Sequence, residues 1–185
     1  MPAGSSDGGQ WTSGGGFGSN NDPDADTSLI PIAGNDPENR YSVDLEEEDR
    51  RGGHGHKDHV SKTDKYLLDV LDDDWIRRST AQYEVTVFRP AEGSFESSLQ
   101  ANDLVNQTLR LHKDTVDLVA SGQLEGATLN HRFGYQTGKE AFRPNGDAEP
   151  YIRPTYGVIV IIRHDPRWER GYRVHTAYPT NRTSK

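Results

Sequence analysis

The sequence predicts an α+β domain in which short N-terminal helices precede a twisted antiparallel sheet, with a disordered acidic arm in front. Three observations lead to this prediction. Apolar residues recur at helical spacing over 63–72 and 95–120, β-branched and aromatic residues mark 156–163 and 172–178, and residues 1–50 are rich in Gly, Ser and Asp. Helices first and strands later are typical of a domain with an antiparallel sheet.

Composition limits the possible classes of protein. The chain has 185 residues and no cysteine, and 31% of its residues are apolar. This length suits one domain plus a tail, and the lack of cysteine excludes disulfides, thiol catalysis and Cys-based zinc fingers. No run approaches 18 apolar residues, so we expect no membrane span. The N-terminus lacks a basic and an apolar region, so we expect no secretory signal peptide.

The charge is unevenly distributed. Residues 1–50 hold eleven acids and two bases, whereas residues 51–185 hold eighteen acids and nineteen bases. We therefore expect a leader over 1–50, which either links the body to a delivery module or folds over its basic surface, and a folded body over 51–185. Residues 131–185 carry ten bases against five acids, which suits contact with phosphate or with an acidic protein.

The individual elements follow from local signals. Ser61 and Asp64 form an S-x-x-D start signal for the helix at 63–72, and residues 45–51 could form one or two helical turns. The stretch 95–120 predicts one or two helices, interrupted at 112–114. We expect strands at 83–88, 127–133, 156–163 and 172–178, the last one ended by Pro179, with a loop over 134–150 and a hairpin connection over 165–171.

A dense histidine cluster offers one candidate metal site. His54, His56, Asp58 and His59 form H-x-H-x-D-H, a zinc-binding pattern of metallo-β-lactamase-type hydrolases, because imidazoles and a carboxylate at this spacing can surround a metal. That fold needs an apolar strand before the motif, but residues 44–51 are highly charged. A zinc-dependent hydrolase therefore remains an alternative, as does a solvated histidine loop without a function.

Motifs at both ends of the body resemble one known family, the bacterial ribonuclease A-like domain of contact-dependent inhibition and other polymorphic toxins. That family shows G-G-H-x4-H-V-G-K-T near its start and G-Y-x-V-x-T-A-Y-P at its end. The matching segments here, within 51–182, are Gly52-Gly53-His54, His59-Val60-Ser61-Lys62-Thr63-Asp64, Leu67-Leu68-Asp69-Val70-Leu71 and Tyr172-Arg173-Val174-His175-Thr176-Ala177-Tyr178-Pro179.

The resemblance implies a metal-independent ribonuclease toxin with no cofactor and with RNA as its substrate. It also implies a cognate immunity protein and delivery by a bacterial export system into the cytoplasm of a target cell, and we expect a monomer. The family's active-site histidine corresponds to His59, and its Thr and Tyr correspond to Thr176 and Tyr178. The chain departs from the family at Val70, where relatives carry Arg, and at Ser61, where Gly is usual.

RNA cleavage without a metal uses the 2′-OH as nucleophile and needs a base, an acid and donors to the phosphate. We expect His59 to act as base or acid, and Thr176 to donate a hydrogen bond. Tyr178 would position or protonate the substrate. Lys62 is our first choice for the cation that replaces the missing Arg, with Lys65 or Arg77 behind it, and His54 is the candidate second histidine.

Strand alternation makes a further prediction about the last strand. Thr176 and Tyr178 should share one face with Tyr172 and Val174, and His175 should point the other way. The ribonuclease hypothesis requires that folding bring His59 close to Thr176 and Tyr178. A non-enzymatic module that binds partners through the acidic arm and the basic sheet is the remaining alternative.

Overall fold

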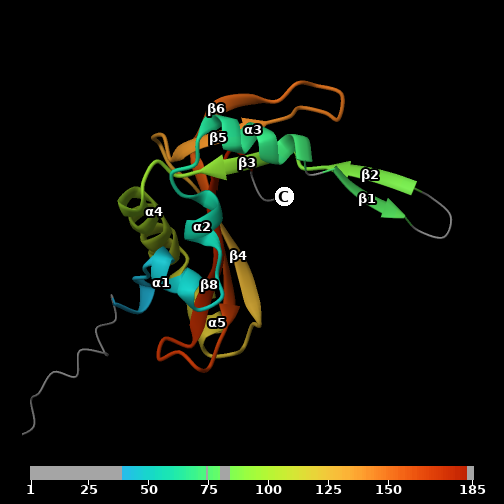
Figure 1. Ribbon diagram of the computed structural model, residues 1–185. Coiled ribbons are helices and arrows are strands. Elements are labelled where there is room, and N and C mark those ends of the chain that lie inside the picture. Colours follow the sequence, from blue (N-terminus) through green and yellow to red (C-terminus); the bar gives the residue numbers. More distant parts are fainter. Residues whose placement is uncertain (1–38, 74, 80–83, 183–185) are drawn as a thin grey trace, which may run out of the picture. The chain divides into compact units, whose positions relative to one another are not determined.

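The computed structural model describes residues 39–73, 75–79 and 84–182 (Figure 1). The disorder that we predicted for the leader concerns mainly residues 1–38, which lie outside this described part. The described helices are η1 (Asn39–Tyr41), α1 (Leu45–Arg50), α2 (Gly55–His59), α3 (Asp64–Asp73), α4 (Ser98–Leu111) and α5 (Lys113–Ala120). None of these helices has the length and apolar character needed to cross a membrane.

The strands form two three-stranded antiparallel sheets and one hairpin. The larger sheet has the order β4 (Gly126–Arg132), β7 (Gly157–His164) and β8 (Tyr172–Thr180). The second sheet has the order β3 (Ala91–Ser94), β5 (Gly138–Phe142) and β6 (Tyr151–Thr155), and β1 (Trp75–Ser79) pairs with β2 (Glu84–Phe88). This architecture confirms the predicted α+β class.

The main core lies between the larger sheet and helices α4 and α5. On β7, the alternate residues Val158, Val160 and Ile162 are completely buried, as the β-branched run predicted. Ser97 caps the N-terminus of helix α4, because its hydroxyl accepts a hydrogen bond from the amide of Gln100. Its apolar face packs on the sheet, together with that of α5. The buried helical residues in this core are Ala101, Leu104, Val105, Leu109, Val116 and Val119.

A β-bulge interrupts β8 and changes which residues share a face. Ile161 pairs with Thr176 and the next residue, Ile162, pairs with Val174, so His175 is the extra residue on β8. We predicted that Thr176 shares a face with Val174, and this is wrong. Val174 pairs with Ile162 on the core face of the sheet, whereas Thr176 pairs with Ile161 on the opposite face. The bulge lies before Thr176, so Thr176 and Tyr178 still share a face, as predicted.

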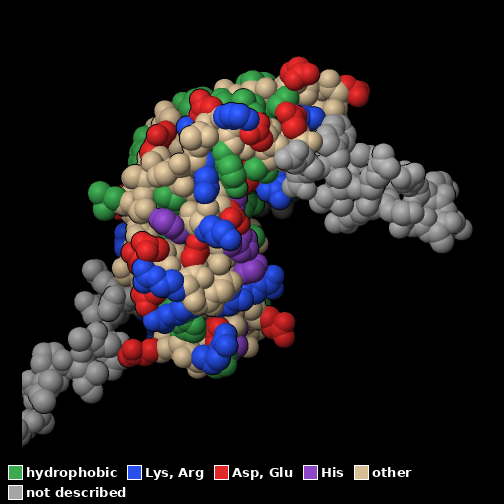
Figure 2. Space-filling model, in the orientation of Figure 1, with side chains coloured by type: hydrophobic (Ala, Val, Ile, Leu, Met, Phe, Trp, Pro, Cys, Tyr) green, Lys and Arg blue, Asp and Glu red, His purple; other side chains and the backbone are tan. Residues whose placement is uncertain are grey.

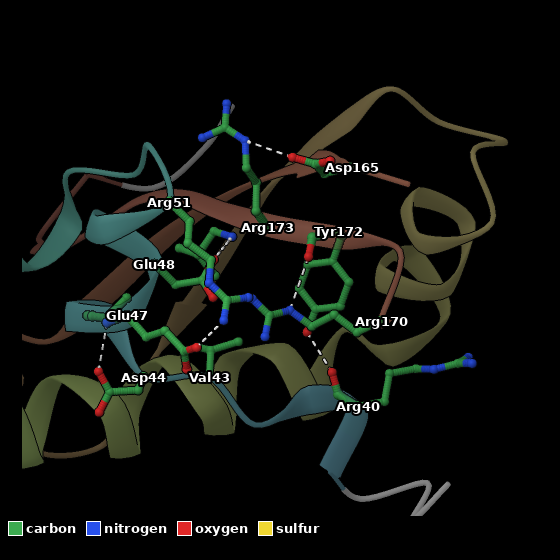
Figure 3. A network of polar contacts seen from close by, with 12 residues as sticks. Arg40, Val43, Asp44, Glu47, Glu48, Arg51, Asp165, Arg170, Tyr172 and Arg173 are labelled. Carbon is green, nitrogen blue, oxygen red and sulfur yellow. Dashed lines mark hydrogen bonds and ion pairs between the residues drawn. The ribbon is translucent and has the colours of Figure 1, made fainter. Parts of the chain in front are cut away.

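The segment before His59 covers the free edge of β8. The carboxylate of Glu48 accepts a hydrogen bond of 2.6 Å from the amide of Val174. It also pairs with the guanidinium of Arg170, and Figure 3 shows these two side chains close together. Burial raises the pKa of Glu48, although Arg170 and the Val174 amide oppose this shift. The amide of His54 donates to the carbonyl of His175 at 3.1 Å. Two backbone groups at the edge of β8 thus have partners outside the sheet.

The packed structure begins before the predicted boundary at residue 51. Leu45 is completely buried in the core, and Val43 is 5% exposed. The amides of both residues donate to side chains of α4, at 2.9 Å to Asn102 and 2.8 Å to Asn106. Residues 43–50 are acidic on average, but their apolar members belong to the body.

The longer helices and the four predicted strands agree with the sequence, but other elements differ. The predicted loop at 54–59 contains α2, the predicted loop at 134–150 contains β5, and β1, β3 and β6 carried no sequence prediction. The last strand also continues through Pro179 to Thr180. Pro179 is tolerated there because β8 is the edge strand of its sheet, where a missing amide donor breaks no necessary ladder bond.

Candidate active site

A cavity of about 280 Å³ lies where β8, β3, β5 and the end of α2 meet. The two sheets approach closely here, because Gly93 on β3 lies directly against the carbonyl oxygen of Pro179 on β8. The polar side chains that line the cavity are those of His54, His59, Arg89, Glu92, Glu140, Thr176, Tyr178, Thr180 and Arg182.

His59 is the last residue of α2 and is 8% exposed. Its Nδ1 lies 3.0 Å from the carbonyl oxygen of Gly93 and 3.1 Å from Oε1 of Glu92. Both partners only accept hydrogen bonds, so Nδ1 carries the proton in this arrangement. The other ring nitrogen, Nε2, is then left with its lone pair for the cavity. A fixed tautomer of this kind is what a general base requires.

Glu92 is a buried carboxylate whose side chain is 7% exposed. Burial alone would raise the pKa of Glu92, but the hydrogen bond and charge of His59, followed by those of Arg89, outweigh it and leave the pKa below its usual range. The ion pair with Arg89 involves the other carboxylate oxygen. Glu92 is therefore ionised at neutral pH and holds His59 in place from β3.

Tyr178 and Thr176 face the same cavity from β8. The ring of Tyr178 lies 5.2 Å from the ring of His59, centroid to centroid. Burial raises the pKa of Tyr178, so its phenol stays protonated and can donate a hydrogen bond. Thr176 is 6% exposed, and its buried hydroxyl has no hydrogen-bond partner among the described residues. A buried polar group without a partner costs about 1–3 kcal/mol and is a common sign of a ligand site.

His54 lines the cavity from the start of α2, and its ring contacts the ring of His175 edge to face at 4.7 Å. Burial lowers the pKa of His175, and the nearby His54, Arg173 and Arg163 lower it further. His54 lines the cavity, whereas His175 lies against His54 and is not one of the lining residues.

The predicted phosphate clamp lies elsewhere. Lys62 does not line the cavity, and its ammonium group lies 5.0 Å above the ring of Tyr66. Lys65 pairs with Asp69 on the surface of α3, and the side chain of Arg77 is outside the described residues. The cations that do line the cavity are Arg89 and Arg182.

Residues 53–179 match the family model of the bacterial CdiA-CT RNase A domain. The chain belongs to this family. The match confirms the resemblance drawn from the end motifs and supports a ribonuclease toxin. A solved structure, the CdiA-CT/CdiI complex from Y. kristensenii, shares the fold with a TM-score of 0.54 and 21% sequence identity, over 69% of this chain and 99% of that one. No curated protein matches the chain.

In this chain the side chains of the histidine cluster have separate partners. His56 Nε2 contacts the hydroxyl of Ser98 at 2.8 Å, whereas Nδ1 of His59 contacts the carbonyl oxygen of Gly93 and the carboxylate of Glu92. Within the described residues, no three His, Asp or Glu side chains come together in a way that could hold a metal ion. The residues thus do not fit the zinc site that the H-x-H-x-D-H pattern predicted.

Sequence reasoning missed five polar residues that line this site, namely Arg89, Glu92, Glu140, Thr180 and Arg182. Glu92 lies within β3 and Arg89 shortly before it, and this strand has no apolar alternation that would have marked it. Arg182 follows β8, and only the basic excess of residues 131–185 pointed in its direction.

Proposed function

We propose that this domain is a metal-independent endoribonuclease that cleaves RNA by attack of the substrate's own 2′-OH on the neighbouring phosphate. The observation that carries the proposal is the fixed tautomer of His59. Its Nδ1 is held by Gly93 and Glu92, which leaves Nε2 for the cavity that Thr176 and Tyr178 share. Family membership supports ribonuclease activity in general.

The proposed reaction needs two proton transfers. Nε2 of His59 accepts the proton of the 2′-OH, and the 2′ oxygen then bonds to phosphorus. The bond from phosphorus to the 5′ oxygen breaks, and His54, in its protonated form, donates a proton to the departing oxygen. The products are a 2′,3′-cyclic phosphate and a free 5′-OH. Because the nucleophile is the 2′-OH, DNA is not a substrate.

The remaining polar groups would stabilise the charged phosphorane. The hydroxyls of Thr176 and Tyr178 are available as hydrogen-bond donors on one wall of the cavity. Arg89 and Arg182 bring positive charge to the same cavity, and we propose that they replace the family Arg that is absent at Val70. Donors fixed before the reaction are worth most at the point where charge develops.

Cleavage of a fluorescent RNA oligonucleotide in the presence of EDTA tests the proposal. The wild-type chain should cleave it, and His59→Ala should reduce kcat/KM by about 10²–10⁴-fold, the usual contribution of a general base. His131→Ala is a matched control, since His131 lies on β4 away from the cavity lining. Complete loss of wild-type cleavage in EDTA would contradict metal independence.

A substrate with an activated leaving group separates the two histidines. In a ribonucleoside 3′-(4-nitrophenyl phosphate), 4-nitrophenolate replaces the 5′ oxygen as leaving group. Its cleavage needs a base but little help from an acid, because 4-nitrophenolate departs without protonation. We expect His59→Ala to lose activity on both this ester and RNA, and His54→Ala to lose activity on RNA only. Equal loss on both substrates in His54→Ala would remove His54 from the acid role.

We also propose that the domain acts as a monomer inside a target bacterium and is neutralised by an immunity protein. The solved structure with the same fold is a complex of CdiA-CT with CdiI, which supports a protein partner here. Expression in bacteria should arrest growth and degrade total RNA, and His59→Ala should abolish both effects. Arrest that persists in His59→Ala would point to a cause other than RNA cleavage.

A further inference from the structure

The face of the larger sheet that carries Thr176 and Tyr178 continues beyond the cavity. In an antiparallel pair, residues directly opposite each other share a face. Ile159 pairs with Tyr178, Ile161 with Thr176, and Arg163 with Arg173, so these three rows follow one another on the same face. Without the bulge at His175, Arg173 and Thr176 would point to opposite faces, because they are three residues apart.

Positive charge gathers along this continuation. Arg163 is exposed and has no ion pair among the described residues, and Arg173 lies across from it on β8. Arg173 is only 3.7 Å from Asp165, but that carboxylate already accepts two hydrogen bonds from Arg167. Figure 3 shows the guanidinium of Arg173 pointing away from the buried Glu48 network.

Two histidines connect these arginines to the cavity. His54 lines the cavity and contacts His175, and Arg173 and Arg163 are close enough to His175 to lower its pKa. We call His54, His175, Arg173 and Arg163 the cationic strip, in which the two arginines carry the positive charge and the two histidines connect them to the cavity. Figure 2 shows histidine side chains next to Lys or Arg side chains on the face of the molecule in view.

The strip ends at a second hollow. An open depression of about 340 Å³ lies over β4 and β7 and is lined by Arg163, Ile161, Thr128 and Glu125, among others. Its lining is mostly polar, with the side chain of Ile161 as an apolar contact beside the last cation of the strip. A nucleoside beyond the scissile phosphate could rest there.

We propose, on the basis of the ribonuclease function above, that the cationic strip binds phosphates of an RNA strand that runs out of the cavity along β7 and β8. The substrate is then an RNA segment of several nucleotides, and a dinucleotide uses only part of the binding surface. Each pair of residues along the face advances about 7 Å, a distance comparable with the spacing of phosphates in an extended strand. Continuity with the cavity favours RNA over an acidic protein as the occupant.

Binding and cleavage of substrates of two lengths test this inference. A non-cleavable 2′-O-methyl RNA of ten nucleotides is titrated by fluorescence anisotropy at several salt concentrations, and cleavage of a dinucleotide is compared with that of a decanucleotide. We expect Arg163→Gln to weaken decanucleotide binding about 3- to 10-fold and to reduce the slope of log K against log salt by about 0.7, the loss of one phosphate contact. Dinucleotide cleavage should change less than twofold.

Two further variants complete the test. Arg163→Lys keeps the charge and should restore most of the affinity. Arg110→Gln removes the same charge from an exposed position on α4 and should leave binding unchanged. We choose Arg163 for the test because Arg173 also donates to the carbonyl of Gly52, so that its replacement affects packing.

The outcomes separate this inference from the ribonuclease proposal. The proposal that the strip binds RNA is refuted if Arg163→Gln leaves decanucleotide affinity unchanged, or if Arg110→Gln lowers this affinity as much as Arg163→Gln does. An acidic protein would then be the better candidate ligand for the strip. An equal loss of dinucleotide cleavage also overturns it, because the strip would then belong to the cavity itself. A wild-type chain that binds the decanucleotide through Arg163 but cleaves neither substrate supports the strip and refutes the ribonuclease proposal.

Discussion

Glu92 and His59 form a buried pair in which the carboxylate oxygen Oε1 lies 3.1 Å from Nδ1 of the imidazole. In Glu92→Gln the side chain keeps its shape but loses the charge that holds the ring. We expect kcat/KM for RNA to fall about 10-fold or more, as part of the general-base contribution.

Glu169→Gln, at an exposed position on the connection between β7 and β8, is the control for Glu92→Gln. The pKa of Glu92 lies below the usual value of about 4.3 for Glu, so its contribution to folding is complete above that pH and is lost as the pH falls further. At neutral pH the Glu92→Gln variant should therefore be less stable than the wild type. As the pH falls below that value, the variant should lose less further stability than the wild type does. An unchanged kcat/KM in Glu92→Gln would argue against a role for Glu92 in positioning His59.

The cations at the cavity can be distinguished by a charge-matched pair of variants. Arg182→Gln should lower kcat/KM about 10-fold at low salt, with a smaller effect at high salt, because it removes charge that faces the phosphate. Lys62→Gln should change the rate less than twofold, because Lys62 lies over Tyr66 outside the cavity. A larger loss in Lys62→Gln than in Arg182→Gln would restore the original assignment from the sequence.

Gly93 allows the two sheets to meet at the cavity. A Cβ at this position would overlap the carbonyl oxygen of Pro179, and neither backbone can move without shifting its sheet. We expect Gly93→Ala to reduce the free energy of unfolding by about 1–3 kcal/mol and to impair cleavage, since the Gly93 carbonyl also holds His59. Chemical denaturation measures the first effect. Gly134→Ala, where a Cβ meets nothing within 4 Å, should be close to neutral.

Ser61 occupies a backbone conformation that favours glycine, with φ at 55°. For a residue with a side chain the left-handed region costs about 1–2 kcal/mol, whereas glycine adds about 0.4–1 kcal/mol of entropy to the unfolded chain. Ser61→Gly relieves the strain, whereas Ser61→Ala keeps it, and both variants lose the hydrogen bond from the Ser61 hydroxyl to Glu96. Ser61→Gly should therefore melt about 1–3 °C above Ser61→Ala. The opposite order would contradict the strain at this position.

The sequence predicted the elements that depend on apolar periodicity. The break between α4 and α5 falls at His112, inside the predicted interruption at 112–114. It could not predict β5, where Glu140 is completely buried but paired with Arg153 of β6, since a charged residue in a strand normally indicates exposure. Helix α2 was also missed, because Asp49, six residues before its start, accepts hydrogen bonds from its first amides.

The candidate site was predictable where it rests on motifs. The end motifs pointed to His59, Thr176 and Tyr178, and the structure brings all three to one cavity with His54. The bulge at His175 has no sequence signal, because it depends on the pairing register of β8 with β7. Glu92 could not be recognised either, because its role depends on the crossing of β3 with the end of α2.

The acidic segment at 43–50 belongs to the folded unit although the family match begins only at Gly53. A chain shortened to start at Gly53 would keep every residue that lines the cavity, but it would lose the Glu48 carboxylate and expose the amide of Val174 on an open strand edge. Such an edge is a template for pairing with another molecule. Removing this short piece should therefore produce aggregates, and we expect the smallest independently folding unit to be longer than the segment that matches the family.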